Sequence, residues 1–164
     1  MKLLLTLLCA VLVWAGSIRD DLGSLERDAI VIGYGLTPVY VFVDPLCPNS
    51  RNFIEVIQSS QKVQKDNTYF VFLYRLQMFD SDGVINAIYH ARNPKEAMLD
   101  VMVKHHAMPR EEAVEEVVRK RKRIKEVAMK IDMHRRPYLM MYPIGGRYCK
   151  VSEGKAACML QSSK

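Results

Sequence analysis

The chain has 164 residues, of which 49% are hydrophobic and 26% are charged, a balance typical of a globular protein. This length suits one domain with its own core, and the composition excludes a low-complexity or disordered protein. The formal net charge of +6 does not by itself distinguish anionic lipid, envelope polymer and nucleic acid as partners.

The first 17 residues have the pattern of a secretory signal peptide. Lys2 gives a short positive segment, Leu3–Val13 is apolar except for one threonine, and small residues follow. Cleavage is expected after Ala15 or Ser17. The run is short for a transmembrane helix, although an uncleaved anchor is the alternative. We therefore expect an exported chain in an oxidising compartment, where cysteines can form disulfides.

The segments that follow alternate between strand and helix patterns. Residues 18–28 are charged and predict an irregular N-terminal lead. The apolar runs 29–32 and 39–43 predict strands, and the second suits a strand buried on both faces. Apolar residues with helical spacing occupy 49–64, and 69–76 predicts another buried strand.

A block of three helices is predicted next, and a hairpin closes the chain. The helices cover 83–91, 93–102 and 109–131, with proline or acidic residues near their starts. Strands are predicted at 138–142 and 147–151. Strands alternating with helices indicate the α/β class, here in a single domain with antiparallel strands at its end.

Cys47 carries the clearest chemical signal. It lies between a predicted strand and a predicted helix, in the stretch Asp44-Pro45-Leu46-Cys47-Pro48-Asn49-Ser50. At a helix start, a thiol meets unpaired backbone N–H groups and the positive end of the helix dipole, which favour the nucleophilic thiolate. Pro48 suits the first helical turn because that position needs no N–H. We expect Cys47 to be exposed and reactive, and a buried structural cysteine is the alternative.

Two further cysteines, Cys149 and Cys158, are close in sequence near the C-terminus. If residues 153–154 form a two-residue turn, the two cysteines stand opposite each other as a non-hydrogen-bonded pair, where a disulfide fits. A short C-terminal helix starting near Ser152 is the alternative, and it also permits this pair. Both arrangements leave Cys47 unpaired.

Three segments together resemble a known family. Val39–Phe53 resembles the active-site entry of thioredoxin-fold proteins, Asn86–Met102 resembles an inserted helical region, and Arg136–Met141 resembles a cis-proline loop with its following strand. The order and content are most similar to the DsbC/DsbG branch of periplasmic thiol–disulfide isomerases. The resemblance spans residues 29–151, and it is carried by the combination of segments more than by the Cys-Pro pair alone.

The resemblance implies a thioredoxin-like α/β fold for the domain 29–164. A helical insertion would separate central strands, and the closing hairpin would follow a cis-proline loop. It implies a cis peptide bond at Pro137 facing Cys47, with the backbone of Arg136 pairing with bound peptide. It also implies that Asp44 lies beneath the site and tunes it, and that the protein works in the periplasm.

Two departures from the family narrow the expected function. Ser50 stands where the family has its second active-site cysteine, so Cys47 can form a mixed disulfide but needs an outside thiol, such as glutathione, to complete a cycle. No other cofactor and no metal are expected. Only a few residues separate the signal segment from the first strand, which favours a monomer over a dimer built on an N-terminal dimerisation domain.

The sequence therefore predicts an exported thiol–disulfide exchange protein of the isomerase or reductase type, using Cys47 on cysteine-containing exported proteins. A membrane redox partner would fit this role. The alternative is a catalytically inactive chaperone or scaffold component of an envelope secretion or conjugation assembly, which Ser50 keeps open. The basic run Arg119–Arg123 is expected to be the solvated face of a helix, and nucleic acid is not an expected partner.

Overall fold

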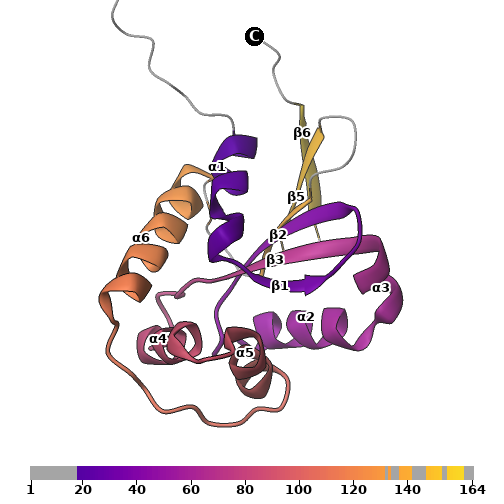
Figure 1. Ribbon diagram of the computed structural model, residues 1–164. Coiled ribbons are helices and arrows are strands. Elements are labelled where there is room, and N and C mark those ends of the chain that lie inside the picture. Colours follow the sequence, from indigo (N-terminus) through magenta and orange to yellow (C-terminus); the bar gives the residue numbers. More distant parts are fainter. Residues whose placement is uncertain (1–17, 132, 134–136, 142–146, 153–154, 161–164) are drawn as a thin grey trace, which may run out of the picture.

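The computed structural model describes residues 18–131, 133, 137–141, 147–152 and 155–160 (Figure 1). The predicted signal peptide lies outside the described residues. Within them, no helix combines the length and apolar character needed to cross a membrane.

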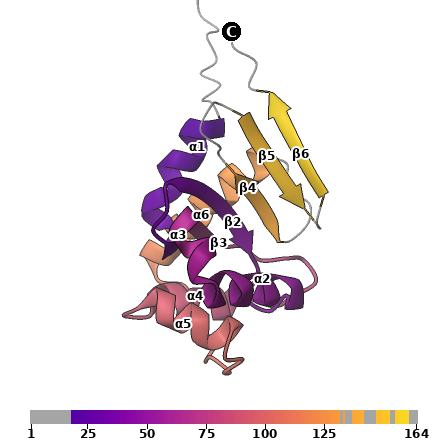
Figure 2. The same ribbon diagram turned by 90° about the vertical axis from the view of Figure 1, so that its right-hand side faces the viewer.

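The described residues form one mixed six-stranded sheet with helices around it (Figures 1 and 2). The strands are β1 (Ile30–Gly33), β2 (Thr37–Val43), β3 (Asn67–Leu73), β4 (Tyr138–Met141), β5 (Arg147–Ser152) and β6 (Lys155–Leu160), and their order is β1-β3-β2-β4-β5-β6. The helices are α1 (Ile18–Leu25), the 3₁₀ turn η1 (Glu26–Asp28), α2 (Pro48–Ser59), α3 (Gln61–Asp66), α4 (Asp82–His90), α5 (Pro94–Met102) and α6 (Glu115–Lys130). Strands β2 and β3 are parallel, and every other pairing is antiparallel.

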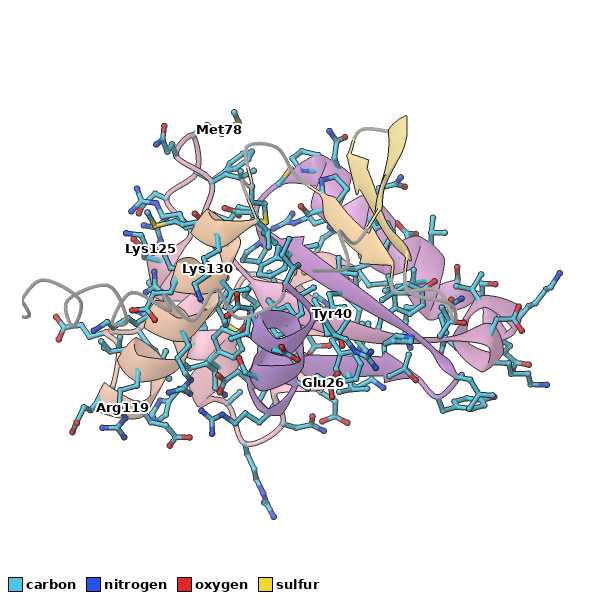
Figure 3. The ribbon with its side chains drawn as sticks, turned by 90° about the horizontal axis from the view of Figure 1, so that it is seen from above. Glu26, Tyr40, Met78, Arg119, Lys125 and Lys130 are labelled. Atoms are coloured by element: carbon cyan, nitrogen blue, oxygen red, sulfur yellow. The ribbon has the colours of Figure 1, made fainter. Side chains whose placement is uncertain are left out.

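Both faces of the two central strands are covered, as their apolar sequences predict. On one face, the Tyr40 hydroxyl donates to Glu26 Oε1 at 2.6 Å, so this face meets the η1 segment (Figure 3). On the other face, the ring of Phe53 on α2 packs edge-on against Tyr69, with centroids 6.3 Å apart. Alternation of side chains along β2 and β3 therefore divides the core into two layers.

The N-terminal lead is a helix, so the prediction of an irregular segment over 18–28 is wrong. Leu22 and Leu25 of α1 are fully buried. Helix α1 packs beside α6 (Figure 1). Two leucines three residues apart share one face of a helix, but the charged residues around them hide this short pattern from a sequence search.

The predicted helix over 49–64 is divided in two. Ser60 is extended, with φ −101° and ψ 99°, and its Oγ accepts a hydrogen bond from the Val63 N–H at 3.3 Å. Ser60 therefore caps α3 and ends the continuity of α2. The strand predicted at 69–76 is confirmed, although β3 begins and ends earlier.

The predicted helix over 109–131 begins later than its acidic residues suggested. The Glu111 N–H donates to the Gly83 carbonyl at 3.2 Å, and the Glu111 carbonyl accepts from Asn86 Nδ2 at 3.0 Å. These bonds hold the backbone of Glu111 against α4, and the segment around it is not helical. Helix α6 starts at Glu115.

The predicted strands 138–142 and 147–151 are confirmed as the antiparallel pair β4 and β5, and the alternative of a C-terminal helix is wrong because residues 155–160 form the strand β6. Strands β5 and β6 pair Ser152 with Lys155 and Cys149 with Cys158 (Figure 2). The two cysteines thus stand opposite each other in the backbone register, while their disulfide remains a prediction. Helices α4 to α6 form the insertion between β3 and β4, so the predicted α/β class and its helical insertion are confirmed.

Candidate functional site

Cys47 follows the carboxyl end of β2 and is the N-cap residue of α2. Its carbonyl accepts a hydrogen bond from the Arg51 N–H at 3.0 Å, and its N–H donates to the Asp44 carbonyl at 3.1 Å. Its side chain makes no capping hydrogen bond. The predicted helix-start position is therefore confirmed. Only 6% of the residue is exposed, so the prediction of an exposed cysteine is wrong.

The three residues after Cys47 divide into an exposed and a buried part. Pro48 and Asn49 are exposed in the first turn of α2, where Pro48 needs no hydrogen-bond acceptor. Ser50 is fully buried, and its Oγ accepts a hydrogen bond from the Asp44 N–H at 3.3 Å. At Ser50, where the resemblance would place a second cysteine, the side chain is therefore a buried hydroxyl that is hydrogen-bonded to the backbone of the loop.

The Cys149–Cys158 row crosses the sheet far from Cys47. Cys149 pairs with Met141, which pairs with Val39 near the start of β2. At a rise of about 3.3 Å per residue, the four steps from Val39 to Val43 alone span about 13 Å. A disulfide needs Cα atoms within about 7 Å, so this register places Cys149 beyond bonding reach of Cys47.

Asp44 is fully buried and its carboxylate accepts three hydrogen bonds. Oδ1 accepts from the Leu46 N–H at 2.8 Å, and Oδ2 accepts from the Leu76 N–H at 2.6 Å and from Ser81 Oγ at 2.8 Å. These bonds join the loop that carries Cys47 to the segment after β3 and to the start of α4. The sequence placed Asp44 beneath the site but gave no sign of these three partners.

Pro137 directly precedes β4. Tyr138, the first residue of that strand, pairs with Phe42 near the end of β2. This register brings Pro137 to the sheet end from which the Cys47 loop leaves, as the resemblance implied. Arg136 lies outside the described residues, and the cis peptide bond remains a prediction.

Four side chains of the basic run make contacts within the protein. Arg119 pairs with Glu115, Lys120 Nζ lies 4.8 Å from the ring centroid of Tyr89, Arg121 binds Asp82 and Asn86, and Arg123 binds Asp28 through two hydrogen bonds. The run is therefore partly solvated: Arg119 and Lys122 are exposed, whereas Lys120, Arg121 and Arg123 are half-buried. Lys120 and Arg121 attach α6 to α4, and Arg123 attaches α6 to η1, whereas the Arg119–Glu115 pair lies within α6.

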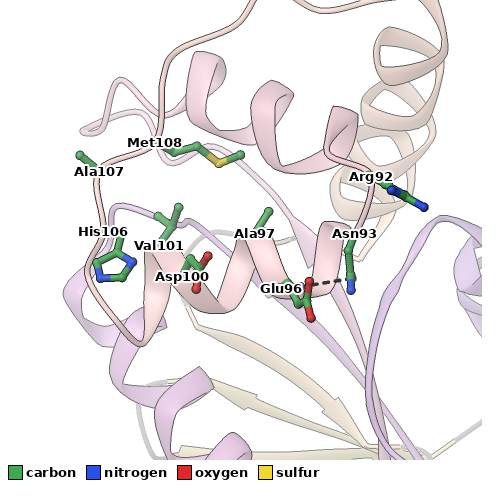
Figure 4. Close-up of a pocket in the computed structure, with 9 residues that line it drawn as sticks. All are labelled: Arg92, Asn93, Glu96, Ala97, Asp100, Val101, His106, Ala107 and Met108. Carbon is green, nitrogen blue, oxygen red and sulfur yellow. Dashed lines mark hydrogen bonds between the residues drawn. The ribbon is translucent and has the colours of Figure 1, made fainter.

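Of the cavities beside the helical insertion, two border the segment that follows α5. The larger, about 810 Å³, lies between α5 and the segment after it, and its wall combines Glu96 and Asp100 with Arg92 and His106 (Figure 4). Lys104, hydrogen-bonded to Asp100, lowers the pKa of that carboxyl. Across the part of the chain that the structure describes, no three His, Cys, Asp or Glu side chains are grouped to hold a metal ion.

The smaller cavity, about 310 Å³, reaches the loop that carries Cys47. Its lining consists of Leu46, Arg51, Val84, Val101, His105, His106, Ala107, Met108 and Arg110. His105 has φ 56°, a left-handed conformation that histidine adopts more often than most residues. The sequence gave no signal for this grouping, because its polar residues come from two segments far apart in the sequence, one with Arg51 and the other with His105, His106 and Arg110.

Comparisons with known proteins support the fold alone. No family model matches the chain, and no curated protein matches it. Among solved structures, a compact conformation of ScsC from Proteus mirabilis has a TM-score of 0.61 at 12% identity, covering 77% of this chain and 70% of that one.

Two other solved structures give the same result. A disulfide interchange protein from Neisseria gonorrhoeae has a TM-score of 0.54 at 18% identity, covering 70% of this chain and 79% of that one. A periplasmic thioredoxin-like protein from Salmonella enterica serovar Typhimurium has a TM-score of 0.54 at 13% identity, with coverages of 76% and 83%. The chain therefore has the thioredoxin-like fold.

Proposed function

We propose that this chain is a periplasmic thiol–disulfide exchange protein that forms mixed disulfides with exported proteins through Cys47. The observation that carries the proposal is the position of Cys47, at the N-cap of α2 after the central strand β2, with its side chain free of any capping bond. The fold shared with a disulfide interchange protein supports the same chemistry. The proposed compartment agrees with the signal-like N-terminus.

In the proposed reaction, the Cys47 thiolate attacks one sulfur of a substrate disulfide. A bond forms between Cys47 and that sulfur, and the second substrate sulfur leaves as a thiolate that takes up a proton from water. A different substrate thiolate can then attack the mixed disulfide and release Cys47, which rearranges the substrate without net oxidation. Attack by an outside thiol such as glutathione instead begins a reduction.

The residues around Cys47 have different roles in the proposed reaction. Cys47 stands at the α2 N-terminus, where the first N–H groups of the helix have no helical partners. The Asp44 carboxylate holds the loop in place through its three hydrogen bonds. We assign Pro137 and the backbone of Arg136 to the opposing lip, where a substrate strand would pair. Ser50 makes Cys47 a monothiol within α2.

The test uses the mature chain and its Cys47→Ser variant. Glutathione-dependent refolding of a protein with scrambled disulfides is measured, together with the rate at which Cys47 is alkylated at neutral pH. We expect refolding to be faster with the wild-type chain than with the variant. Equal refolding rates, with alkylation no faster than that of a free cysteine peptide, would exclude the proposed activity.

A catalytically inactive chaperone or scaffold is the second candidate, favoured by the low exposure of Cys47 and the burial of Ser50. Such a protein would suppress aggregation of an unfolded substrate equally well with Cys47 or with serine at that position. The same pair of proteins therefore separates the two functions. Dependence on Cys47 supports exchange, and equal protection without exchange supports the chaperone.

A further inference from the structure

The cavity of about 310 Å³ beside Cys47 has a basic lining. Arg51 and Arg110 carry full charges, His105 and His106 add ring nitrogens, and the remaining lining residues are apolar. No aspartate or glutamate is among the lining residues. A small pocket lined by several donors, with no carboxylate in its lining, is suited to an anion.

Arg51 connects this cavity to the reactive loop. It is on the first turn of α2, and its N–H donates to the Cys47 carbonyl at 3.0 Å. Its Nε donates to the Pro45 carbonyl at 2.7 Å, which holds the guanidinium against the loop. Among the described residues, its other four guanidinium N–H groups have no partner, so they can donate to a ligand.

Arg110 approaches from the helical insertion. It pairs with Asp80 through one terminal nitrogen, and that bond lowers the pKa of the Asp80 carboxyl. The pair is exposed, and Arg110 keeps further donors for a second acceptor. Gly83 makes room for this arginine, since a Cβ there would meet Arg110 Cβ at 2.7 Å.

We propose that this cavity binds a carboxylate carried by the thiol or disulfide that exchanges with Cys47. The inference rests on the proposed function and adds a substrate class to it. Leu46 and Arg51, both in the lining, flank Cys47 in the chain, so a carboxylate held there leaves the attached sulfur near the reactive thiol. The carboxylate can belong to a small thiol compound or to an acidic side chain beside a substrate cysteine.

The first experiment compares three small disulfides of similar size: anionic dithiodipropionate, neutral bis(2-hydroxyethyl) disulfide and cationic cystamine. The rate of adduct formation at Cys47 is measured by mass spectrometry and peptide mapping. Charge-assisted hydrogen bonds to one carboxylate should make the ratio of anionic to cationic rates about tenfold higher in the wild type than in an Arg51→Gln/Arg110→Gln variant.

A matched control removes the same charge elsewhere. Lys62 and Lys65 are exposed on α3, so a Lys62→Gln/Lys65→Gln variant has the same net charge as the test variant. The ratio should stay at its wild-type value in this control. A general disturbance of the Cys47 loop would slow all three probes together and leave the ratio unchanged, which would overturn the inference.

A second arm distinguishes the two sources of carboxylate. Peptide disulfides with aspartate or lysine beside the cysteine replace the small probes. A preference for the aspartate peptide alone assigns the site to protein substrates, and a preference for dithiodipropionate alone assigns it to small thiols. Reaction with every probe at equal rates overturns the inference and leaves the proposed function standing, whereas no reaction with any probe overturns the proposed function and the inference with it.

Discussion

Tyr89 joins the helical insertion to the sheet through one buried hydroxyl. The side chain is on α4, and its hydroxyl accepts a hydrogen bond from the Leu73 N–H at the end of β3, at 2.8 Å. Burial raises the pKa of Tyr89 far above its ordinary value. Lys120 lies over the face of the ring, 4.8 Å from its centroid. This residue therefore holds α4, α6 and β3 together at one point.

Replacing Tyr89 with phenylalanine keeps the ring and removes the acceptor. The buried Leu73 N–H then has no partner, which should lower the free energy of unfolding by about 1–3 kcal/mol. Urea denaturation measures the loss. Tyr34→Phe is the control, because Tyr34 is 70% exposed and should change stability little. Equal losses for the two variants would contradict this role of the Tyr89 hydroxyl.

The raised pKa of Tyr89 also predicts that the stability difference between the wild type and Tyr89→Phe depends on pH. Because the pKa of Tyr89 is raised in the folded chain, the unfolded chain loses its phenol proton first as the pH passes about 10. Fewer protons are then bound in the unfolded state, so the wild-type stability falls with rising pH. The stability difference between wild type and Tyr89→Phe should therefore shrink between about pH 8 and about pH 10.5. A constant difference would show that the phenol does not contribute.

At the scale of elements, α6 shows what a charge pattern can and cannot predict. Helical spacing places Val117, Ile124 and Val127 on the buried face of this helix, whereas Val114 and Val118 of the same apolar pattern are 41% and 49% exposed. The partners of its bases were not predictable, since Asp28 and Asp82 lie far away in the sequence. A run of basic residues in the sequence does not identify the acidic residues that it contacts in the folded chain.

The bond between Arg123 and Asp28 involves the more buried carboxylate of these attachments. Asp28 has 5% of its side chain exposed and receives two hydrogen bonds of 2.7 Å from Arg123, whose side chain is 35% exposed. Arg123→Gln leaves a buried carboxylate without its partner and should cost about 2 kcal/mol, a value reduced by the partial exposure of the arginine. Urea denaturation checks this.

Two further variants interpret that measurement. Adding Asp28→Asn to Arg123→Gln removes the unpaired charge and should restore part of the lost stability. Lys130→Gln breaks an exposed pair with Asp21 and should change stability by less than about 1 kcal/mol. A loss for Arg123→Gln no larger than for Lys130→Gln would show that the attachment to η1 contributes little.

The hairpin β5–β6 gives a separate prediction. The register places Cys149 opposite Cys158 with two residues in the turn, which makes them a non-hydrogen-bonded pair with close Cα atoms. Mass spectrometry of the unreduced protein should find them joined, and reduction should lower stability by about 2–3 kcal/mol. The Cys47→Ser variant should contain the same bond. A peptide linking Cys47 to either cysteine would contradict the monothiol proposal.

At the scale of the whole molecule, the order of β1 to β5 with α2, α4, α5 and α6 was predictable because each of these segments carried its own local signal. Helix α1 and the break between α2 and α3 carried no such signal and were missed. The thioredoxin-like resemblance supplied the sheet and the place of the insertion. The basic cavity was not predictable, because Arg51, His105 and Arg110 meet only after α2 and the insertion pack. The burial of Cys47 was missed for the same reason. The local sequence predicts that Cys47 lies at a helix start, but it does not predict which other segments cover the residue.

Export gives a prediction for the complete chain. Helix α1 begins at Ile18, directly after the expected cleavage positions, and its two leucines are part of the core. We expect the mature protein from a bacterial host to start at Gly16 or Ile18, with α1 intact, by N-terminal sequencing and intact mass. A chain that retains Met1, or one cut inside α1, would contradict the signal-peptide assignment.

The buried hydroxyl of Ser50 has a kinetic consequence. In a protein with two active-site thiols, the second thiol is always present at high local concentration and ends each covalent complex within the same molecule. In this chain Ser50 has no thiol, and its hydroxyl accepts a hydrogen bond from the Asp44 N–H. In the proposed exchange, a complex formed at Cys47 would therefore persist until another thiol arrives. Its lifetime would be set by the thiol supply of the compartment, so the protein would hold its partners longest where the surroundings are most oxidising.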